Sequence, residues 1–138
     1  SAQDFDEVKH LLSPIVRNRA EHVVMECDRV QKAVAALTAG DLVTLGALLN
    51  QSHYSLRDLY EVTGKELDTL SALAREQKDC LGSRMIGAGF GGCTISIVKK
   101  TAVEGFIRRV GKAYHDVIGY RASFYETSIE DGITVTKL

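Results

Sequence analysis

The sequence predicts an α+β domain: two long antiparallel helices precede a ferredoxin-like antiparallel sheet that is covered by helices on one face. In the first half, two long stretches carry apolar residues at helical spacing, and only Gly40 and Asp41 separate them. In the second half, the patterns follow the order helix, strand, strand, helix, strand, strand. The 138 residues show no internal repeat or linker-like stretch, so we expect one domain over residues 1–138.

Composition and charge exclude several classes of protein. Apolar residues make up 45% and charged residues 25% of the chain, as in globular domains. The net charge of −1 gives no electrostatic signature for nucleic acid or an anionic membrane, and no apolar run approaches the length of a membrane span. The three cysteines are an odd number without CxxC spacing, which is typical of reduced thiols, so we expect a cytoplasmic protein.

The first half has clear helix boundaries. Asp4 and Glu7 have the spacing of a capping box, which predicts a short first helix. Ser13 and Pro14 match an N-cap and a first helical residue, and Gly40 is placed to end the long helix that follows. The apolar stripe of this helix is Val16, Ala20, Val23, Val24, Cys27, Val30, Val34 and Leu37. Asp41 can cap the next helix, whose stripe is Leu42, Leu45, Leu49, Ser52, Leu56 and Leu59.

The second half alternates between helix and strand signals. Thr63 and Glu66 predict a capping box at the start of a helix that ends near Cys80. Thr101 and Glu104 predict another capping box, for a helix that ends at Gly119. The predicted strands are 83–86, 93–98, 122–127 and 132–136.

A glycine-rich stretch lies between the first two predicted strands. Gly82–Cys93 holds five of the 12 glycines, which permit positive φ angles and close approach of another molecule to the backbone. Gly87, Gly89 and Gly92 satisfy GxGxxG, but a strand follows them where a dinucleotide site needs a helix. A Walker A site is also excluded, because no Lys-Ser or Lys-Thr follows at the required spacing. An anion-binding loop and a hairpin without a ligand both remain open.

Other candidate chemistry is weaker. Ser52, His53 and Asp58 suggest a catalytic triad, but Asp58 lies too far along a helix to share their face, which favours a polar helix end that bonds a neighbouring loop. Cys93 follows the glycines, and its alternation with Ile95 favours a small core residue over a reactive thiol. The four histidines and three cysteines show no metal-ligand spacing, so we expect no metal site.

The glycine stretch, read as Gly-Ser-Arg-Met-Ile-Gly-Ala-Gly-Phe-Gly-Gly-Cys over residues 82–93, resembles the C-terminal motif of the GHMP sugar and metabolite kinases in its galactokinase form. The run Ser-His-Tyr-Ser-Leu-Arg-Asp-Leu-Tyr-Glu-Val over residues 52–62 is similar to a galactokinase segment, and the Glu-Leu-Asp at 66–68 follows it as in that family. Shorter matches are Arg19, 22–24, 40–42, 123–125 and 131–132. The resemblance therefore covers nearly the whole chain.

The resemblance implies that this chain is only the C-terminal part of a galactokinase, whose sugar-binding and phosphate-binding signatures and catalytic aspartate and arginine are absent here. No catalytic residue is therefore expected in this chain. The intact family uses ATP and Mg²⁺ to phosphorylate the C1 hydroxyl of galactose in a cleft between two domains. By resemblance, the residues that face this cleft are Gly87, Ala88, Gly89, Phe90, Gly91 and Gly92.

Several expectations follow from this resemblance. The fragment alone is expected to be inactive, to bind no cofactor tightly, and to self-associate through the surface that its missing N-terminal domain would cover. Alternatives are an N-acetylgalactosamine kinase, a non-catalytic galactokinase-like sugar sensor, and a free-standing ligand-binding module.

Overall fold

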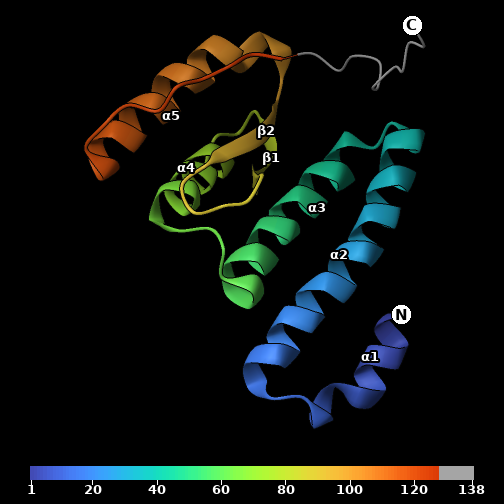
Figure 1. The fold of residues 1–138 in the computed structure, drawn as a ribbon. Coiled ribbons are helices and arrows are strands. Elements are labelled where there is room, and N and C mark those ends of the chain that lie inside the picture. Colours follow the sequence, from blue (N-terminus) through green and yellow to red (C-terminus); the bar gives the residue numbers. More distant parts are fainter. Residues whose placement is uncertain (128–138) are drawn as a thin grey trace, which may run out of the picture.

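The computed structural model describes residues 1–127 and has the predicted α+β architecture (Figure 1). Its α-helices are α1 (Ala2–Val8), α2 (Pro14–Ala39), α3 (Leu42–Ser55), α4 (Lys65–Arg75) and α5 (Val103–Ile118). Its strands are β1 (Cys80–Ile86) and β2 (Cys93–Val98). Shorter helical turns are the 3₁₀ turns η1 (Lys9–Leu11) and η3 (Lys100–Ala102) and the π-helical turn η2 (Leu56–Tyr60). Among the described residues, no helix is both long and apolar enough to cross a membrane.

The boundary between α2 and α3 follows the sequence prediction. Gly40 adopts a left-handed conformation with φ of 71°, and its N–H caps the end of α2. The carboxylate of Asp41 then accepts the backbone N–H of Thr44 at 2.9 Å, which caps the start of α3. These two residues reverse the chain, so that α2 and α3 form an antiparallel pair (Figure 1).

The three predicted capping boxes are wrong. Helix α1 does begin with a capping box, but its members are Ser1 and Asp4, three residues earlier than predicted. No side chain caps α4, whose N-cap is Gly64, or α5, which continues from the turn η3. Threonine followed three residues later by glutamate thus does not predict the N-cap here, because α4 and α5 each begin one residue after the threonine-based N-cap would require: their N-caps are Gly64 and Ala102.

Among residues 1–127, the sheet consists of β1 and β2, which pair antiparallel with Arg84 opposite Ile95 and Ile86 opposite Cys93. Helix α4 covers the face that carries Ser83 and Met85, and α5 packs against α4 (Figure 1). One core cluster joins Leu56, Leu67 and Met85. The other joins Ala74, Phe106 and Val110 and includes Phe124 at its margin.

Helix α3 packs against β1 more closely than side chains would allow. A Cβ atom on Gly46 would lie 2.1 Å from the carbonyl oxygen of Leu81, and one on Gly82 would lie 2.2 Å from the carbonyl oxygen of Gly46. Two glycines therefore permit backbone-to-backbone contact between the helix and the strand.

Residues 122–127 do not form the predicted strand. This extended segment runs back along α5 (Figure 1), where the ring of Phe124 contacts the α5–α4 core beside Gly111. Its alternating pattern therefore reflects packing on a helix rather than strand pairing. The predicted strand 132–136 lies outside the described residues. Helix α4 also ends earlier than predicted, at Arg75, and β1 already begins at Cys80.

Candidate functional site

The glycine loop, residues 87–92, connects β1 to β2. Four of its six residues have positive φ angles: Gly87 at 79°, Gly89 at 87°, Phe90 at 56° and Gly91 at 103°. Positive φ is the conformation that glycine adopts at little cost, which explains why the sequence concentrates glycines here. All its residues are exposed except the half-buried Gly89, and Phe90 is 77% exposed.

The loop is anchored at one point to the backbone of Val62. The N–H of Phe90 donates to the carbonyl oxygen of Val62 at 2.9 Å. A Cβ atom on Gly89 would lie only 1.9 Å from the same oxygen. The bare backbone of Gly89 is therefore what lets the loop reach Val62.

Val62 is presented to the loop by the turn that ends α3. The helix continues into the π-helical turn η2, and Glu61 then takes a left-handed conformation with φ of 59°. The N–H of Val62 donates to the carbonyl oxygen of Leu56, while its side chain packs on the Leu56–Leu67–Met85 cluster. From α2, Arg19 donates to the carbonyl oxygen of Leu59 and pairs with Glu61. The Arg19 contacts to the preceding turn and the packing of the Val62 side chain thus hold the Val62 carbonyl in place.

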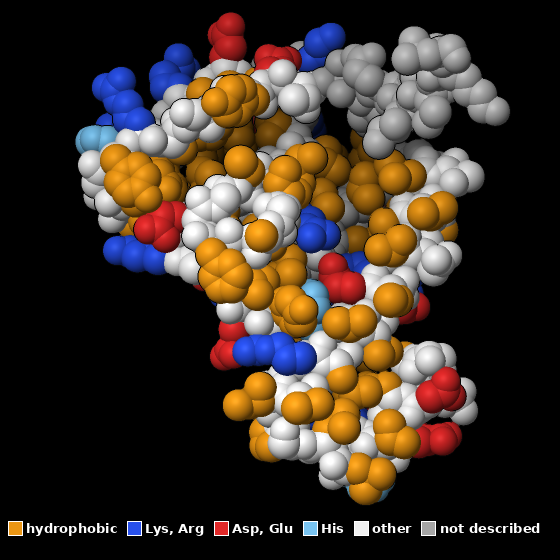
Figure 2. All heavy atoms as spheres, in the orientation of Figure 1, with side chains coloured by type: hydrophobic (Ala, Val, Ile, Leu, Met, Phe, Trp, Pro, Cys, Tyr) orange, Lys and Arg blue, Asp and Glu red, His pale blue; other side chains and the backbone are white. Residues whose placement is uncertain are grey.

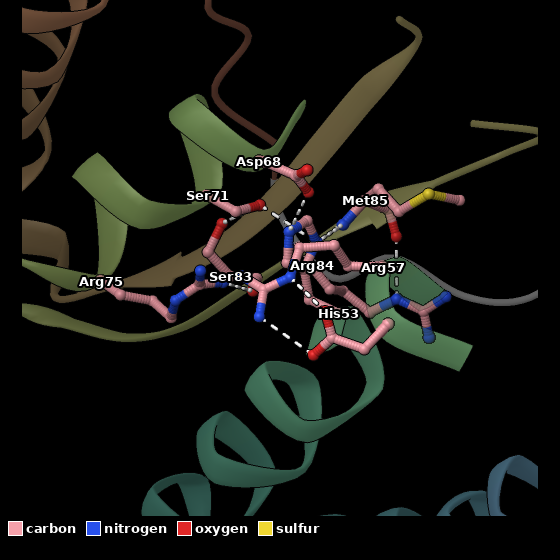
Figure 3. A network of polar contacts seen from close by, with 9 residues as sticks. His53, Arg57, Asp68, Ser71, Arg75, Ser83, Arg84 and Met85 are labelled. Atoms are coloured by element: carbon pink, nitrogen blue, oxygen red, sulfur yellow. Dashed lines mark hydrogen bonds and ion pairs between the residues drawn. The ribbon is translucent and has the colours of Figure 1, made fainter. Parts of the chain in front are cut away.

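The strand that leads into the loop is held by side chains along the edge opposite β2 (Figure 3). The N–H of Ser83 donates to Asn50 Oδ1 at 2.9 Å, and the N–H of Met85 donates to His53 Nδ1 at 3.1 Å. The carbonyl oxygen of Ser83 accepts from Arg75 at 3.1 Å, and that of Met85 accepts from Arg84 at 2.8 Å. Side chains of α3, α4 and β1 itself therefore occupy the backbone groups that a third strand would pair with.

His53 is the centre of this network and is fully buried. Because its Nδ1 accepts the Met85 N–H, the ring proton is on Nε2, which lies 3.2 Å from Asp68 Oδ1. Burial lowers the pKa of His53, the positive charge of Arg75 acts in the same direction, and Asp68 opposes both. A neutral imidazole with a fixed tautomer is the form that can accept the backbone N–H.

The polar run 52–60 therefore supports the loop and is not a triad. The Ser52 hydroxyl donates to Glu26 at 2.7 Å, and Asp58 pairs with Arg57 rather than with His53. The favoured interpretation, a polar helix end, is confirmed, but its hydrogen bonds reach helix α2 and strand β1 rather than the predicted neighbouring loop. Sequence reasoning missed three partners: Asn50 for β1, Asp68 for His53 and the Val62 carbonyl for the glycine loop. The last had no signal in the sequence, since every residue has a backbone carbonyl.

A second polar cluster lies beside the first, between α2, α3 and β1. Glu26 accepts from Ser52, lies 3.7 Å from the Arg84 guanidinium and pairs with Arg29. Nearby, the ring of Tyr60 stacks on His22 at 4.6 Å. Burial lowers the pKa of His22, and the positive charges of Arg29, Arg84 and Arg19 lower it further.

Cys93 differs from the prediction, because it is exposed rather than a core residue. Its neighbour Ile95 on the same face of β2 is also 45% exposed. Among residues 1–127, no group of three or more His, Cys, Asp and Glu side chains is arranged to hold a metal ion. What this region offers to a ligand is thus an exposed glycine loop whose backbone another molecule can approach closely, on a strand that buried polar contacts hold in place.

Comparisons with known proteins identify the family. A family model described as "GHMP kinases C terminal" matches residues 33–116, which is more than half of the chain and includes the loop and its anchor on Val62. The chain belongs to the GHMP kinases. The galactokinase of Clostridium acetobutylicum is 54% identical over 130 residues, which are 94% of this chain and 33% of that protein. The galactokinase of Clostridium perfringens is 57% identical over 116 residues, which are 84% of this chain and 30% of that protein.

A solved structure of this GHMP kinase family has the same fold. The Lactococcus lactis galactokinase, solved in complex with galactose, superposes with a TM-score of 0.88 and 48% identity over 91% of this chain and 32% of that one. This GHMP kinase chain thus spans about a third of the length of the relatives it matches.

Proposed function

We propose that this chain is the C-terminal domain, residues 1–138, of a galactokinase, which transfers the γ-phosphate of ATP to the C1 hydroxyl of α-D-galactose. The observation that carries the proposal is the glycine loop, with its positive φ angles and its anchor on Val62, in a chain that is 54% identical to a galactokinase over nearly its whole length. The relatives reported above are all galactokinases, which favours galactose over N-acetylgalactosamine and a kinase over a sensor.

In this proposal, Gly87, Ala88, Gly89, Phe90, Gly91 and Gly92 face the cleft between this domain and the N-terminal domain. The bare backbone lets the sugar and the transferring phosphate approach closely, and the anchor on Val62 fixes where they meet it. Phosphoryl transfer depends mainly on positioning and charge stabilisation, so a loop of fixed shape contributes even without a catalytic side chain.

ATP and Mg²⁺ would serve the full-length enzyme, where the metal ion would supply positive charge to neutralise the phosphates. The described residues fit only part of this requirement: the loop suits close approach to a phosphate, whereas no acidic cluster among residues 1–127 is arranged for the metal ion. The metal ligands and the catalytic groups would therefore come from the N-terminal domain, and the C-terminal chain alone would be inactive.

The test is a galactose-dependent ADP-release assay on the full-length protein and on this chain alone. Turnover is expected for the full-length protein with galactose and not for the 138-residue chain. Equal concentrations of N-acetylgalactosamine and glucose serve as the competing substrates. Faster turnover with N-acetylgalactosamine, or no turnover with any sugar by a folded full-length protein, would overturn the proposal.

Two secondary expectations belong to the same proposal. The exposed apolar surface of the isolated chain should lead it to self-associate, which sedimentation velocity over a range of concentrations would detect. The three unpaired thiols suit a reducing compartment, and we place the protein in the cytoplasm, which cell fractionation would check.

A further inference from the structure

Helix α2 carries two stripes of residues, each with alternating steps of four and three. The first faces α3 and is largely polar: His22 contacts Ser55 at 2.8 Å, and Glu26 accepts from Ser52 at 2.7 Å. Its members are His22, Glu26, Arg29, Ala33 and Ala36. The contact between α2 and the rest of the described chain therefore depends largely on polar groups.

The second stripe, here called the α2 apolar stripe, is displaced by about 100° around the helix and faces solvent. Its members are Val16, Ala20, Val23, Cys27, Val30, Val34 and Leu37. Val16, Val23, Val30, Val34 and Leu37 are each at least 50% exposed, and Cys27 is exposed as well. Figure 2 shows hydrophobic side chains gathered along this helix. The periodicity that predicted α2 thus marks a face that residues 1–127 leave uncovered.

The spacing of the α2 apolar stripe specifies the shape of what would cover it. Alternating steps of three and four over three heptads form a seam for a second helix, which packs at a small crossing angle. From Val16 to Leu37 the stripe is about 32 Å long at 1.5 Å per residue, which matches a helix of about 20 residues.

The place of the stripe indicates which part of the protein carries that helix. Val30 and the Glu26–Arg84 pair border the same small cleft between α2, α3 and β1, so the middle of the stripe adjoins the cleft beside the strand that leads to the glycine loop. The matched domain is the C-terminal one, and relatives are about three times as long as this chain. A large N-terminal portion, which would share the cleft at the loop, is thus the nearest candidate to cover the stripe.

We propose that an amphipathic helix of the N-terminal portion of the full-length protein packs along the α2 apolar stripe and fixes the two domains relative to each other. This inference rests on the proposed function only in that the chain is part of a longer kinase. It makes α2 a docking helix whose polar side binds its own domain and whose apolar side binds the other.

Cys27 lies in the middle of the α2 apolar stripe, so the reactivity of its thiol shows whether another segment covers the stripe. The experiment measures alkylation rates in the full-length protein, by peptide mass spectrometry, for Cys27 and for a control thiol introduced by Lys32→Cys. Lys32 lies on the other side of α2 with a side chain that is 63% exposed. Labelling in concentrated guanidinium chloride gives the intrinsic rate of each thiol.

Relative to those intrinsic rates, Cys27 should react at least about tenfold more slowly than the Lys32→Cys thiol, because the reagent must wait for local opening of the interface. Equal relative rates would overturn the proposal. Protection of Cys27 that disappears on dilution would also overturn it, because a second copy of the protein would then be the cover. The measurement needs no turnover, so a catalytically inactive protein with a protected Cys27 would contradict the kinase assignment alone.

Discussion

The contact between Gly89 and the Val62 carbonyl gives the sharpest prediction about the glycine loop. In Gly89→Ala the new Cβ would lie 1.9 Å from the Val62 oxygen, so the loop must move away and lose the 2.9 Å bond from the Phe90 N–H. The φ angle of 87° adds a second penalty, of about 1–2 kcal/mol for an L-residue in the left-handed region.

Gly119→Ala is the matched control, because Gly119 has a similar φ of 96° and open space around its Cβ position. It should lose only the backbone penalty, about 1–2 kcal/mol of unfolding free energy. Gly89→Ala should lose that amount and the hydrogen bond and overlap as well, about 2–4 kcal/mol in total.

Urea denaturation of this chain measures both losses. With a slope of about 2 kcal/mol per M, the Gly89→Ala midpoint should fall by about 1–2 M and the Gly119→Ala midpoint by about half as much. In the full-length protein, galactose-dependent turnover should fall for Gly89→Ala and stay near the original rate for Gly119→Ala. Equal midpoints for the two variants would refute the Val62 contact as the reason for glycine at position 89.

Three further predictions concern the supports of the loop. Gly46→Ala would place a Cβ 2.1 Å from the Leu81 oxygen and should lower the unfolding free energy by about 3 kcal/mol or more. Gly105→Ala is the control and should be neutral or slightly stabilising, because its Cβ meets only the end of the Arg109 side chain. Similar urea midpoints for the two variants would contradict the α3–β1 contact. Asn50→Ala leaves the Ser83 N–H without its partner and should cost about 1–3 kcal/mol, while Gln51→Ala at the exposed neighbouring position should change the midpoint little. Burial lowers the pKa of His53 below its ordinary 6.5, so as the pH falls the unfolded chain takes up the proton at a higher pH than the folded chain. The contribution of His53 to stability should therefore be complete above pH 6.5 and decrease as the pH falls below it. His53→Gln should flatten this pH dependence of the unfolding free energy, measured by urea titration between pH 7 and 5, and an unchanged pH dependence would exclude His53 as its source.

The helices and the first hairpin could be predicted from the sequence because their signals are local. Gly40 followed by Asp41 determines where α2 ends and α3 begins, and the alternation from Cys93 to Val98 matches β2. The extended segment 122–127 could not be assigned in this way, because Phe124 packs on a helix with the same alternation that a strand would show.

The sequence predicted that polar residues support a neighbouring segment, but not which groups they bond. A polar helix end indicated hydrogen bonds to some neighbour, but nothing local indicates that His53 accepts the N–H of Met85, 32 residues away. The anchor of Gly89 is a backbone carbonyl, which any residue at position 62 would supply. The burial of α2 was the least predictable feature, because the helix turns its polar stripe, with His22 and Glu26, toward α3.

The side-chain bonds along β1 also determine how this domain behaves beside other copies of itself. A two-stranded sheet normally presents open backbone groups on which a strand from another molecule can add, and this is a common start of aggregation. Here Asn50, His53, Arg75 and Arg84 already occupy the outward N–H and carbonyl groups of Ser83 and Met85. An added strand would have to displace all four side chains, one of them a fully buried histidine, to pair with both Ser83 and Met85. Side chains from α3, α4 and β1 itself thus shield β1 from intermolecular strand addition.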